Sequence, residues 1–200
     1  IKRINTEIKK DNIIVGVSGG VDSTVMACII NNVVGKRCYA VLIDHGLLRK
    51  DEAKQCVDSL RDGLGINIHL YDESEIFFSR LKGVVDPEKK RKIIGDQFIQ
   101  SFDRIADEIG ECKFLGQGTL YPDLIESGVS ASNSSHLIKS HHNVGGLPKN
   151  LKFKLIEPLK DLFKDEVRAV GKELHIPNEL IDRHPFPGPG LGVRIIGEIT

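Results

Sequence analysis

The sequence predicts an α/β fold, a three-layer sandwich around a mostly parallel, doubly wound sheet. Short apolar runs alternate along the chain with longer stretches of helical periodicity, and this alternation is typical of a parallel sheet covered by helices on both faces. The first apolar run, residues 13–17, leads through a polar turn into a helical stretch, as in a βαβ unit. The 200 residues, of which 40% are hydrophobic and 28% charged, suit one well-buried domain. We therefore expect a single domain over residues 1–200.

Each expected element follows from its own pattern. The first ten residues have the spacing of an amphipathic helix, and runs of β-branched and aromatic residues indicate strands. The expected order is a helix to about Lys10, strands at 13–17 and 37–43, a helix at 50–62, and strands at 66–71 and 113–116, with helices between. Ligands bind such sheets at the carboxyl ends of the strands, so one crevice should border the turns after the first two strands.

The longest helical signal covers residues 87–109. Asp86 is a suitable N-cap and Pro87 suits the first helical position. One apolar stripe at helical spacing is formed by Ile94, Phe98, Phe102, Ile105 and Ile109. Arg91 projects along this stripe, where a guanidinium needs an anionic partner. We therefore consider Arg91 a ligand-binding candidate, with a structural ion pair as the alternative.

A polar turn, Ser-Gly-Gly-Val-Asp-Ser at residues 18–23, joins the first strand to the first long helix. Gly19 and Gly20 lack Cβ, so their backbone can adopt positive φ and present successive N–H groups to one anion. The serine hydroxyls can donate to phosphate oxygens, while Asp22 suits a phosphate site only if a divalent cation lies between. A Walker A loop would need a Gly-Lys-Ser/Thr ending, which this turn lacks. The predicted ligand is a magnesium-bound polyphosphate.

Composition restricts the partners and the compartment. Basic and acidic residues balance at 28 each, so no overall field attracts nucleic acid or a membrane surface. Apolar runs are too short to span a bilayer and no secretory signal pattern is present, so we expect a cytoplasmic location. The cysteines are scattered, without a C-x-x-C pair, which favours reduced thiols over zinc or disulfides. Residues 130–148 are rich in glycine and small polar residues, which indicates a mobile loop over the crevice.

The polar turn resembles the PP-loop of the N-type ATP pyrophosphatases, which include GMP, NAD and asparagine synthetases and several tRNA-modifying enzymes. Four further segments narrow the resemblance: KRKIIG at 90–95, QGTLYPD at 117–123, IKSHHNVGGLP at 138–148 and HPFPGPGLG at 184–192. Together they resemble the ATP-pyrophosphatase domain of the GMP synthetases over essentially the whole chain. The implied fold is that of the adenine nucleotide alpha-hydrolase-like proteins.

The resemblance implies a two-step reaction. The O2 of XMP attacks the α-phosphate of Mg-ATP, which gives adenylated XMP and pyrophosphate, and ammonia then displaces AMP to form GMP. GMP synthetases obtain this ammonia from a glutaminase domain or subunit and carry a C-terminal dimerisation domain. We expect both to lie outside this chain and the parent protein to be a homodimer.

The resemblance also implies a set of site residues. It assigns ATP binding to Ser18, Gly19, Gly20, Val21, Asp22, Ser23, Val41, Leu42 and Gly118. It assigns XMP binding to Arg91, His184, Pro185, Phe186 and Gly188. Asp22 and Lys139 are the catalytic candidates, and Asp22 and Asp123 the Mg²⁺ ligands. The alternatives are a helix cap for Asp22, a turn residue for Asp123, a solvated side chain for Lys139 and ordinary strand core for Val41 and Leu42. Lys164 lies in a segment, residues 159–168, that resembles one shared widely in the superfamily, and by composition alone this segment is only a helix start capped by Asp161.

Two other functions are compatible with the PP-loop. One is an NAD synthetase or a tRNA-modifying enzyme, which would adenylate a carboxylate or a base. The other is a non-catalytic module that binds ATP as a sensor, in which Asp22 would have no task. The acceptor that triggers pyrophosphate release distinguishes the enzymes, and unchanged ATP beside every acceptor would indicate the sensor.

Overall fold

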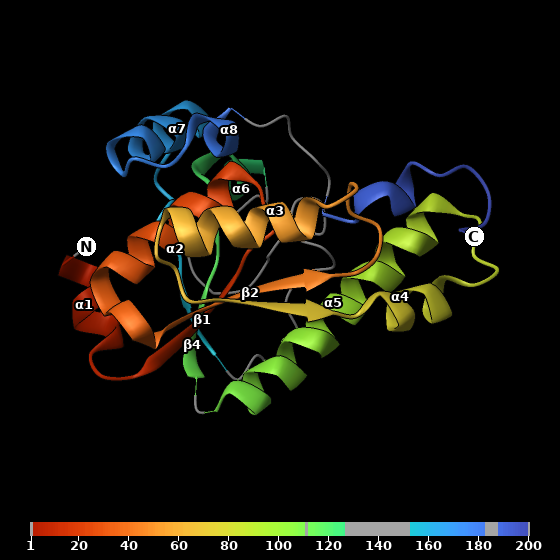
Figure 1. Cartoon of the computed structure of the whole chain (residues 1–200), viewed down its shortest axis with the longest axis horizontal. Helices are drawn as coiled ribbons and strands as arrows, with labels where there is room; N and C mark the ends of the chain where they lie inside the picture. Colours follow the sequence, from red (N-terminus) through yellow and green to blue (C-terminus); the bar gives the residue numbers. More distant parts are fainter. Residues whose placement is uncertain (1, 111, 127–152, 183–187, 200) are drawn as a thin grey trace.

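A single parallel sheet organises the computed structural model of this chain, which describes residues 2–110, 112–126, 153–182 and 188–199 (Figure 1). The sheet has five strands in the order β3-β2-β1-β4-β5, and every neighbouring pair is parallel. The strands are β1 (Asn12–Gly16), β2 (Cys38–Asp44), β3 (Ile68–Asp72), β4 (Cys112–Gly116) and β5 (Lys154–Ile156). The chain builds outward from β1 on one side and then returns to the other, so the strand order reverses between β1 and β4. Ligands bind at this kind of switch point in doubly wound sheets.

Helices cover both faces of the sheet, which confirms the predicted α/β class. They are α1 (Lys2–Ile8), α2 (Val21–Val34), α3 (Glu52–Asp58), α4 (Ser74–Leu81), α5 (Pro87–Ile109), α6 (Tyr121–Glu126), α7 (Lys164–Glu173) and α8 (Asn178–Ile181). Short 3-10 turns lie at η1 (Gly35–Arg37) and η3 (Gly190–Val193), and a π-helical turn, η2 (Ser59–Gly63), extends α3. In the part of the chain that the structure describes, the helices are too short or too polar to cross a membrane.

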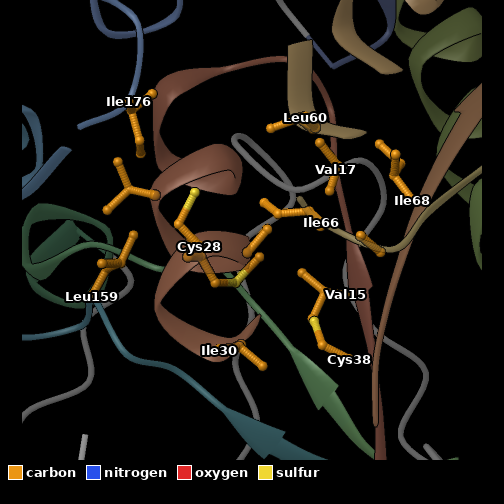
Figure 2. Packing of buried hydrophobic residues seen from close by; sticks show 14 of the residues in the cluster. Val15, Val17, Cys28, Ile30, Cys38, Leu60, Ile66, Ile68, Leu159 and Ile176 are labelled. Carbon is orange, nitrogen blue, oxygen red and sulfur yellow. The ribbon is translucent and has the colours of Figure 1, made fainter. Parts of the chain in front are cut away.

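Alternating strand residues divide the core into two clusters. Ile13 and Val15 of β1 face the cluster that packs α1, α2, α3, α7 and α8 on the sheet, whereas Ile14 faces the cluster under α4 and α5. Figure 2 shows part of the first cluster, where Cys28 and Cys38 lie among aliphatic side chains. Burial raises the pKa of each of these two thiols to about 12. They are therefore protonated packing residues, as the scattered cysteines predicted.

The edge strand β5 has no counterpart among the expected strands. It contains three residues, Lys154–Ile156, which are too few to show a period-2 pattern. Its pairing with β4 defines it as a strand, because Leu155 lies opposite Leu115 and Ile156 opposite Gly116.

Helix α5 begins and ends at the predicted residues, Pro87 and Ile109. The Asp86 carboxylate accepts a hydrogen bond from the Lys89 amide at 2.8 Å, which confirms the predicted N-cap. The side chain that enters the protein body from the first turns is Lys90, which is fully buried. Its ammonium donates to the carbonyls of Ile195 and Gly197 at 2.8 and 2.6 Å. The sequence analysis predicted that Arg91, the next residue, would project into the protein body, whereas the structure places Lys90 there.

The cap of α5 predicts a measurable contribution to stability. Asp86→Ala leaves one first-turn amide without its acceptor, and we expect the free energy of unfolding to fall by about 1 kcal/mol. Urea unfolding followed by circular dichroism measures this loss. Asp86→Asn keeps an oxygen acceptor and is expected to cost only a few tenths of a kcal/mol. Equal losses in the two variants would contradict the capping role.

Candidate functional site

The polar turn at residues 18–23 lies at the carboxyl end of β1, next to the switch point of the sheet. The Val17 amide donates to the Val41 carbonyl at 2.8 Å, so the β1 backbone stays paired with β2 up to the turn. Gly19 has φ +74°, as predicted. Gly20 does not use positive φ: at φ −82° and ψ 156° it has the extended conformation usual for a residue that precedes a helix.

Hydrogen bonds between the turn's own residues hold its shape. The Ser23 hydroxyl accepts from the Ser18 amide at 3.1 Å and donates to the Gly20 carbonyl at 3.0 Å. The two serine hydroxyls are 3.2 Å apart. Behind the turn, the first amides of α2 have no acceptor within the helix and add its positive dipole end. The result is a braced cradle of N–H donors that suits an anion.

Asp22 in the first turn of α2 pairs with Lys164, the first residue of α7. Lys164 Nζ lies 2.5 Å from Asp22 Oδ2, and both side chains are partly exposed. The other carboxylate oxygen, Oδ1, is buried and has no hydrogen-bond partner among the described residues. An orphaned buried carboxylate oxygen beside an anion cradle fits a cation or a donor group of a ligand.

The predicted cap of α7, Asp161, is wrong. The helix begins at Lys164 and follows Phe163, whose amide donates to the Glu166 carboxylate at 2.7 Å. A glutamate at the third helical position reaches back in this way in the capping box. Lys164 is therefore the first residue of this helix, and its ammonium reaches Asp22 in the polar turn at residues 18–23.

Gly118, after β4, lies against the same turn. A Cβ at Gly118 would be 3.7 Å from atoms of Asp22 and from the Ser23 amide nitrogen. The adjacent Gln117 is 7% exposed, and its Oε1 has no hydrogen-bond partner in the described part of the chain. The structure thus brings Gly118 and residues 18–23 together, as the resemblance implied.

The other metal candidate, Asp123, is engaged in a turn. Its Oδ2 accepts from the Leu120 amide at 2.9 Å at the start of α6. Over residues 2–110, 112–126, 153–182 and 188–199, no group of three or more His, Cys, Asp or Glu side chains could hold a metal ion. A Mg²⁺ ion here could still be bound by one or two carboxylates, with water and the phosphates of its ligand as the other ligands, which is the usual arrangement for this ion.

Val41 and Leu42 lie in β2 with their side chains in opposite faces of the core, 0% and 2% exposed. They form ordinary strand core, so any adenine contact would have to come through their backbone. Their place in the ATP site stays a prediction.

Arg91 has the structural ion pair that was its alternative. Its Nε and Nη2 donate to the two oxygens of Glu88 at 2.8 and 2.7 Å. Gly188 is half-buried at the start of the last described segment. The remaining candidates, Lys139, His184, Pro185 and Phe186, lie outside the described residues, as does the loop at 130–148.

His45, after β2, is a residue that the sequence analysis did not single out. It is 1% exposed, and its Nδ1 accepts from the Leu47 amide at 3.1 Å. Burial lowers the pKa of His45 to about 4, although Asp44 and a backbone hydrogen bond to Gly188 act in the other direction. The ring is therefore neutral at pH 7. No periodic pattern marks a single buried residue in a loop.

This chain is similar to known proteins over its whole length. The GMP synthase (glutamine-hydrolyzing) of Lactobacillus delbrueckii subsp. bulgaricus is 54% identical over 200 residues, which are 100% of this chain and 38% of that protein. The GMP synthase of Chlorobium luteolum is 56% identical with the same coverage. The chain belongs to the GMP synthase family. It spans 38% of the length of these two relatives.

More distant similarities agree on the fold. The family model described as NAD synthase matches residues 1–99 of this GMP synthase family member. The NMN synthetase structure from Francisella tularensis has a TM-score of 0.67 at 15% identity, covering 96% of this chain and 76% of that one. The NH3-dependent NAD synthetase from Campylobacter jejuni gives 0.67 at 14% identity, covering 91% and 73%. This chain thus has the same fold as these two synthetase structures.

The buried neutral His45 predicts a pH-dependent stability. Its folded pKa of about 4 lies below its ordinary 6.5, so the unfolded chain takes up a proton first as the pH falls. The stabilisation is complete above pH 6.5 and is lost toward pH 4. Between neutral pH and pH 5 we expect the free energy of unfolding to fall by about 2 kcal/mol from this group.

Urea unfolding at a series of pH values measures this fall. His45→Asn should flatten the curve above pH 5, where few carboxylates titrate. The exposed His175 is the matched control, and His175→Asn should leave the curve unchanged. The same slope in wild type and His45→Asn would contradict a neutral buried ring.

Proposed function

We propose that this chain is the part of a GMP synthase that activates XMP with ATP. The xanthine O2 of XMP forms a bond to the α-phosphorus of ATP, the bond from that phosphorus to the β-phosphate oxygen breaks, and pyrophosphate leaves. Ammonia then adds at C2 of the purine, AMP departs with the former O2, and GMP forms with loss of a proton. The observation that carries the proposal is the braced cradle at residues 18–23, in a chain that matches GMP synthases along its whole length.

The cradle suits the leaving group of this reaction. Negative charge builds on pyrophosphate as its bond to the α-phosphorus breaks, and fixed N–H donors stabilise such charge without reorganising. Each charge-assisted hydrogen bond contributes roughly 1.5–3 kcal/mol, so several turn amides together outweigh one side chain. Lys164, 2.5 Å from Asp22, brings a positive charge to the same place. Its ammonium would balance Asp22 before the nucleotide binds and approach the phosphates afterwards.

Magnesium fits the donor set at this site. Asp22 would hold the ion through Oδ1, the buried oxygen that lacks a partner among the described residues. Asp123 is the second candidate and would have to leave its turn hydrogen bond with Leu120. When bound, Mg²⁺ supplies charge neutralisation on the departing diphosphate. Asp22, held between the cradle and Lys164, would determine where the positive charge of the ion lies.

The acceptor and the ammonia come from outside the cradle. We propose that Arg91 and Gly188 contact XMP together with His184, Pro185 and Phe186, and that Lys139 assists at the α-phosphate. Ammonia would come from a glutaminase domain or subunit, and the whole protein would be a homodimer in the cytoplasm. These assignments follow the resemblance to the GMP synthase family.

NAD synthetase is the less favoured alternative. Its family model matches residues 1–99, which contain the PP-loop. The match to GMP synthases extends over 200 residues and so includes the segments at 117–123 and 184–192.

The direct test is pyrophosphate release from ATP and Mg²⁺ in a protein of the full length of the relatives. We expect XMP to trigger release and the carboxylate acceptor of NAD synthetases to have no effect, and ammonia should then yield GMP. The isolated chain of 200 residues should bind ATP but turn over XMP poorly. Release with the carboxylate acceptor alone, or no release with either, would contradict the proposal.

The geometry of the cradle predicts the effect of a single glycine substitution. Gly19→Val forces a β-branched residue to φ +74° within the cradle, and we expect ATP binding to be abolished while the fold persists. Isothermal titration calorimetry with Mg-ATP measures the affinity.

The other end of α2 offers a matched control. Gly35 also has a positive φ, +59°, and a Cβ there would have no heavy atom within 4 Å. Gly35→Val therefore also places a β-branched residue at positive φ, but it lies away from the cradle and should bind ATP like wild type. Loss of ATP binding in both variants would show that strain in α2, and not the cradle, is responsible.

A further inference from the structure

Gln117, the first residue after β4, has a buried side chain with an unpaired oxygen. The residue is 7% exposed, and its Oε1 is buried without a hydrogen-bond partner among the described residues. Gln97 in α5 offers a comparison: it is 6% exposed, but its Oε1 accepts from Arg80 at 2.8 Å and its Nε2 donates to the Ser101 hydroxyl at 3.1 Å. An unpaired buried polar atom costs free energy and calls for a ligand, an ordered water or a functional role.

The backbone fixes the face of the sheet on which Gln117 lies. Its amide continues the β4–β5 ladder with a hydrogen bond of 3.0 Å. A Cβ at Gly116 would be 2.8 Å from a side chain of α2, and one at Gly118 would be 3.7 Å from atoms of Asp22 in the same helix. Both neighbours thus face α2, and Leu115 packs in the cluster under α4 and α5. Because successive strand residues point to opposite faces, Gln117 faces α5.

The surroundings of Gln117 on this face explain why its oxygen is unpaired. The pairing of Val15 with Gly116 places the two following residues, Gly16 and Gln117, side by side. A Cβ at Gly16 would be 2.9 Å from Phe102 Cζ, so the aromatic ring of α5 lies directly over this glycine. Neither a glycine nor a phenylalanine has a side-chain donor for the amide oxygen.

The strand order separates the two proposed substrates. The proposed function places the ATP beside β2, through Val41 and Leu42, and its polyphosphate on the cradle after β1. Strand β4 lies on the opposite side of β1 from β2. In a displacement at phosphorus the attacking and leaving oxygens are roughly in line, so the acceptor approaches from the side away from the cradle. The cradle lies at the start of α2, whereas Gln117 faces α5, which is the side of the acceptor.

We propose that Gln117 binds the xanthine ring of XMP through Oε1 and so orients the acceptor oxygen, O2, toward the α-phosphorus. The inference rests on the proposed function. The ring carbon that bears O2 lies between two nitrogens, and a protonated ring nitrogen can donate to an amide oxygen. Ionised phosphates have only acceptors and cannot satisfy this atom. The last torsion of a glutamine side chain is soft, so the amide can turn toward the ligand while the strand stays in place.

Gln117→Met removes the amide and keeps the length of the side chain. Because Oε1 has no partner among the described residues, we expect the urea midpoint of this variant to equal or exceed that of wild type. Gln97→Met is the matched buried control. It removes two hydrogen bonds and leaves Arg80 and Ser101 without them, so its urea midpoint should fall.

Steady-state kinetics of pyrophosphate release in a protein of the full length of the relatives test the ligand. In Gln117→Met we expect the KM for XMP to rise by about tenfold, the loss of one hydrogen bond, while the KM for ATP stays within about twofold. Gln97 bonds side chains of α4 and α5, and Gln97→Met should leave both KM values unchanged.

Three results would overturn the assignment. A lower urea midpoint for Gln117→Met, or its failure to fold, would show that the amide has a structural role. Unchanged KM values would show that it binds neither substrate. A rise in the KM for ATP as large as that for XMP, or larger, would assign the amide to the ribose hydroxyls of ATP. Absence of XMP-dependent pyrophosphate release in wild type would refute the proposed function and this assignment with it, whereas an active wild type with any of the three results refutes the role of Gln117 alone.

Discussion

The candidate site depends on the way in which helix α2 begins. In α5 a carboxylate, Asp86, accepts from the first turn and completes the helix from within the chain. Helix α2 is preceded by Gly20, and no side chain of the described residues caps it. Its first amides therefore remain available at the carboxyl end of the central strand, where the strand order reverses. A helix start that the chain leaves incomplete is one that a phosphate can complete.

The charge beside this helix start is set by packing between distant parts of the chain. Helix α7 lies close on α2 because Gly171 has no side chain: a Cβ there would be 3.2 Å from Val25 Cγ2. This approach places the first residue of α7, Lys164, against Asp22. A carboxylate at a helix N-terminus is stabilised by the dipole, but it would repel a phosphate. Lys164 offsets that repulsion, so the cradle can keep an acidic metal-ligand candidate.

Local sequence patterns predicted most of the helices and strands. They did not predict the contacts between residues that are far apart in the chain. The bounds of α5, the cap at Asp86 and the strand, turn and helix around residues 18–23 depend on neighbours in sequence, and each was confirmed. Strand β5 and the Asp22–Lys164 pair depend on residues far away in the chain. Lys90 was accessible from the sequence, since it lies four residues before Ile94 and so on the same apolar stripe. The sequence analysis chose Arg91, which lies three residues before Ile94, and did not consider Lys90, whose full burial is unusual for a lysine.

The last described segment, residues 188–199, is held by hydrogen bonds at both of its ends. An irregular segment has backbone groups without sheet or helix partners, and leaving them buried and unpaired costs about 1–3 kcal/mol each. Lys90 donates to the carbonyls of Ile195 and Gly197, and at the other end the Leu191 amide donates to the Leu47 carbonyl. A strand is positioned by a ladder of many hydrogen bonds, so the loss of any one of them changes its position little. Residues 188–199 are held instead by a few hydrogen bonds from other elements, so their position depends on very few residues.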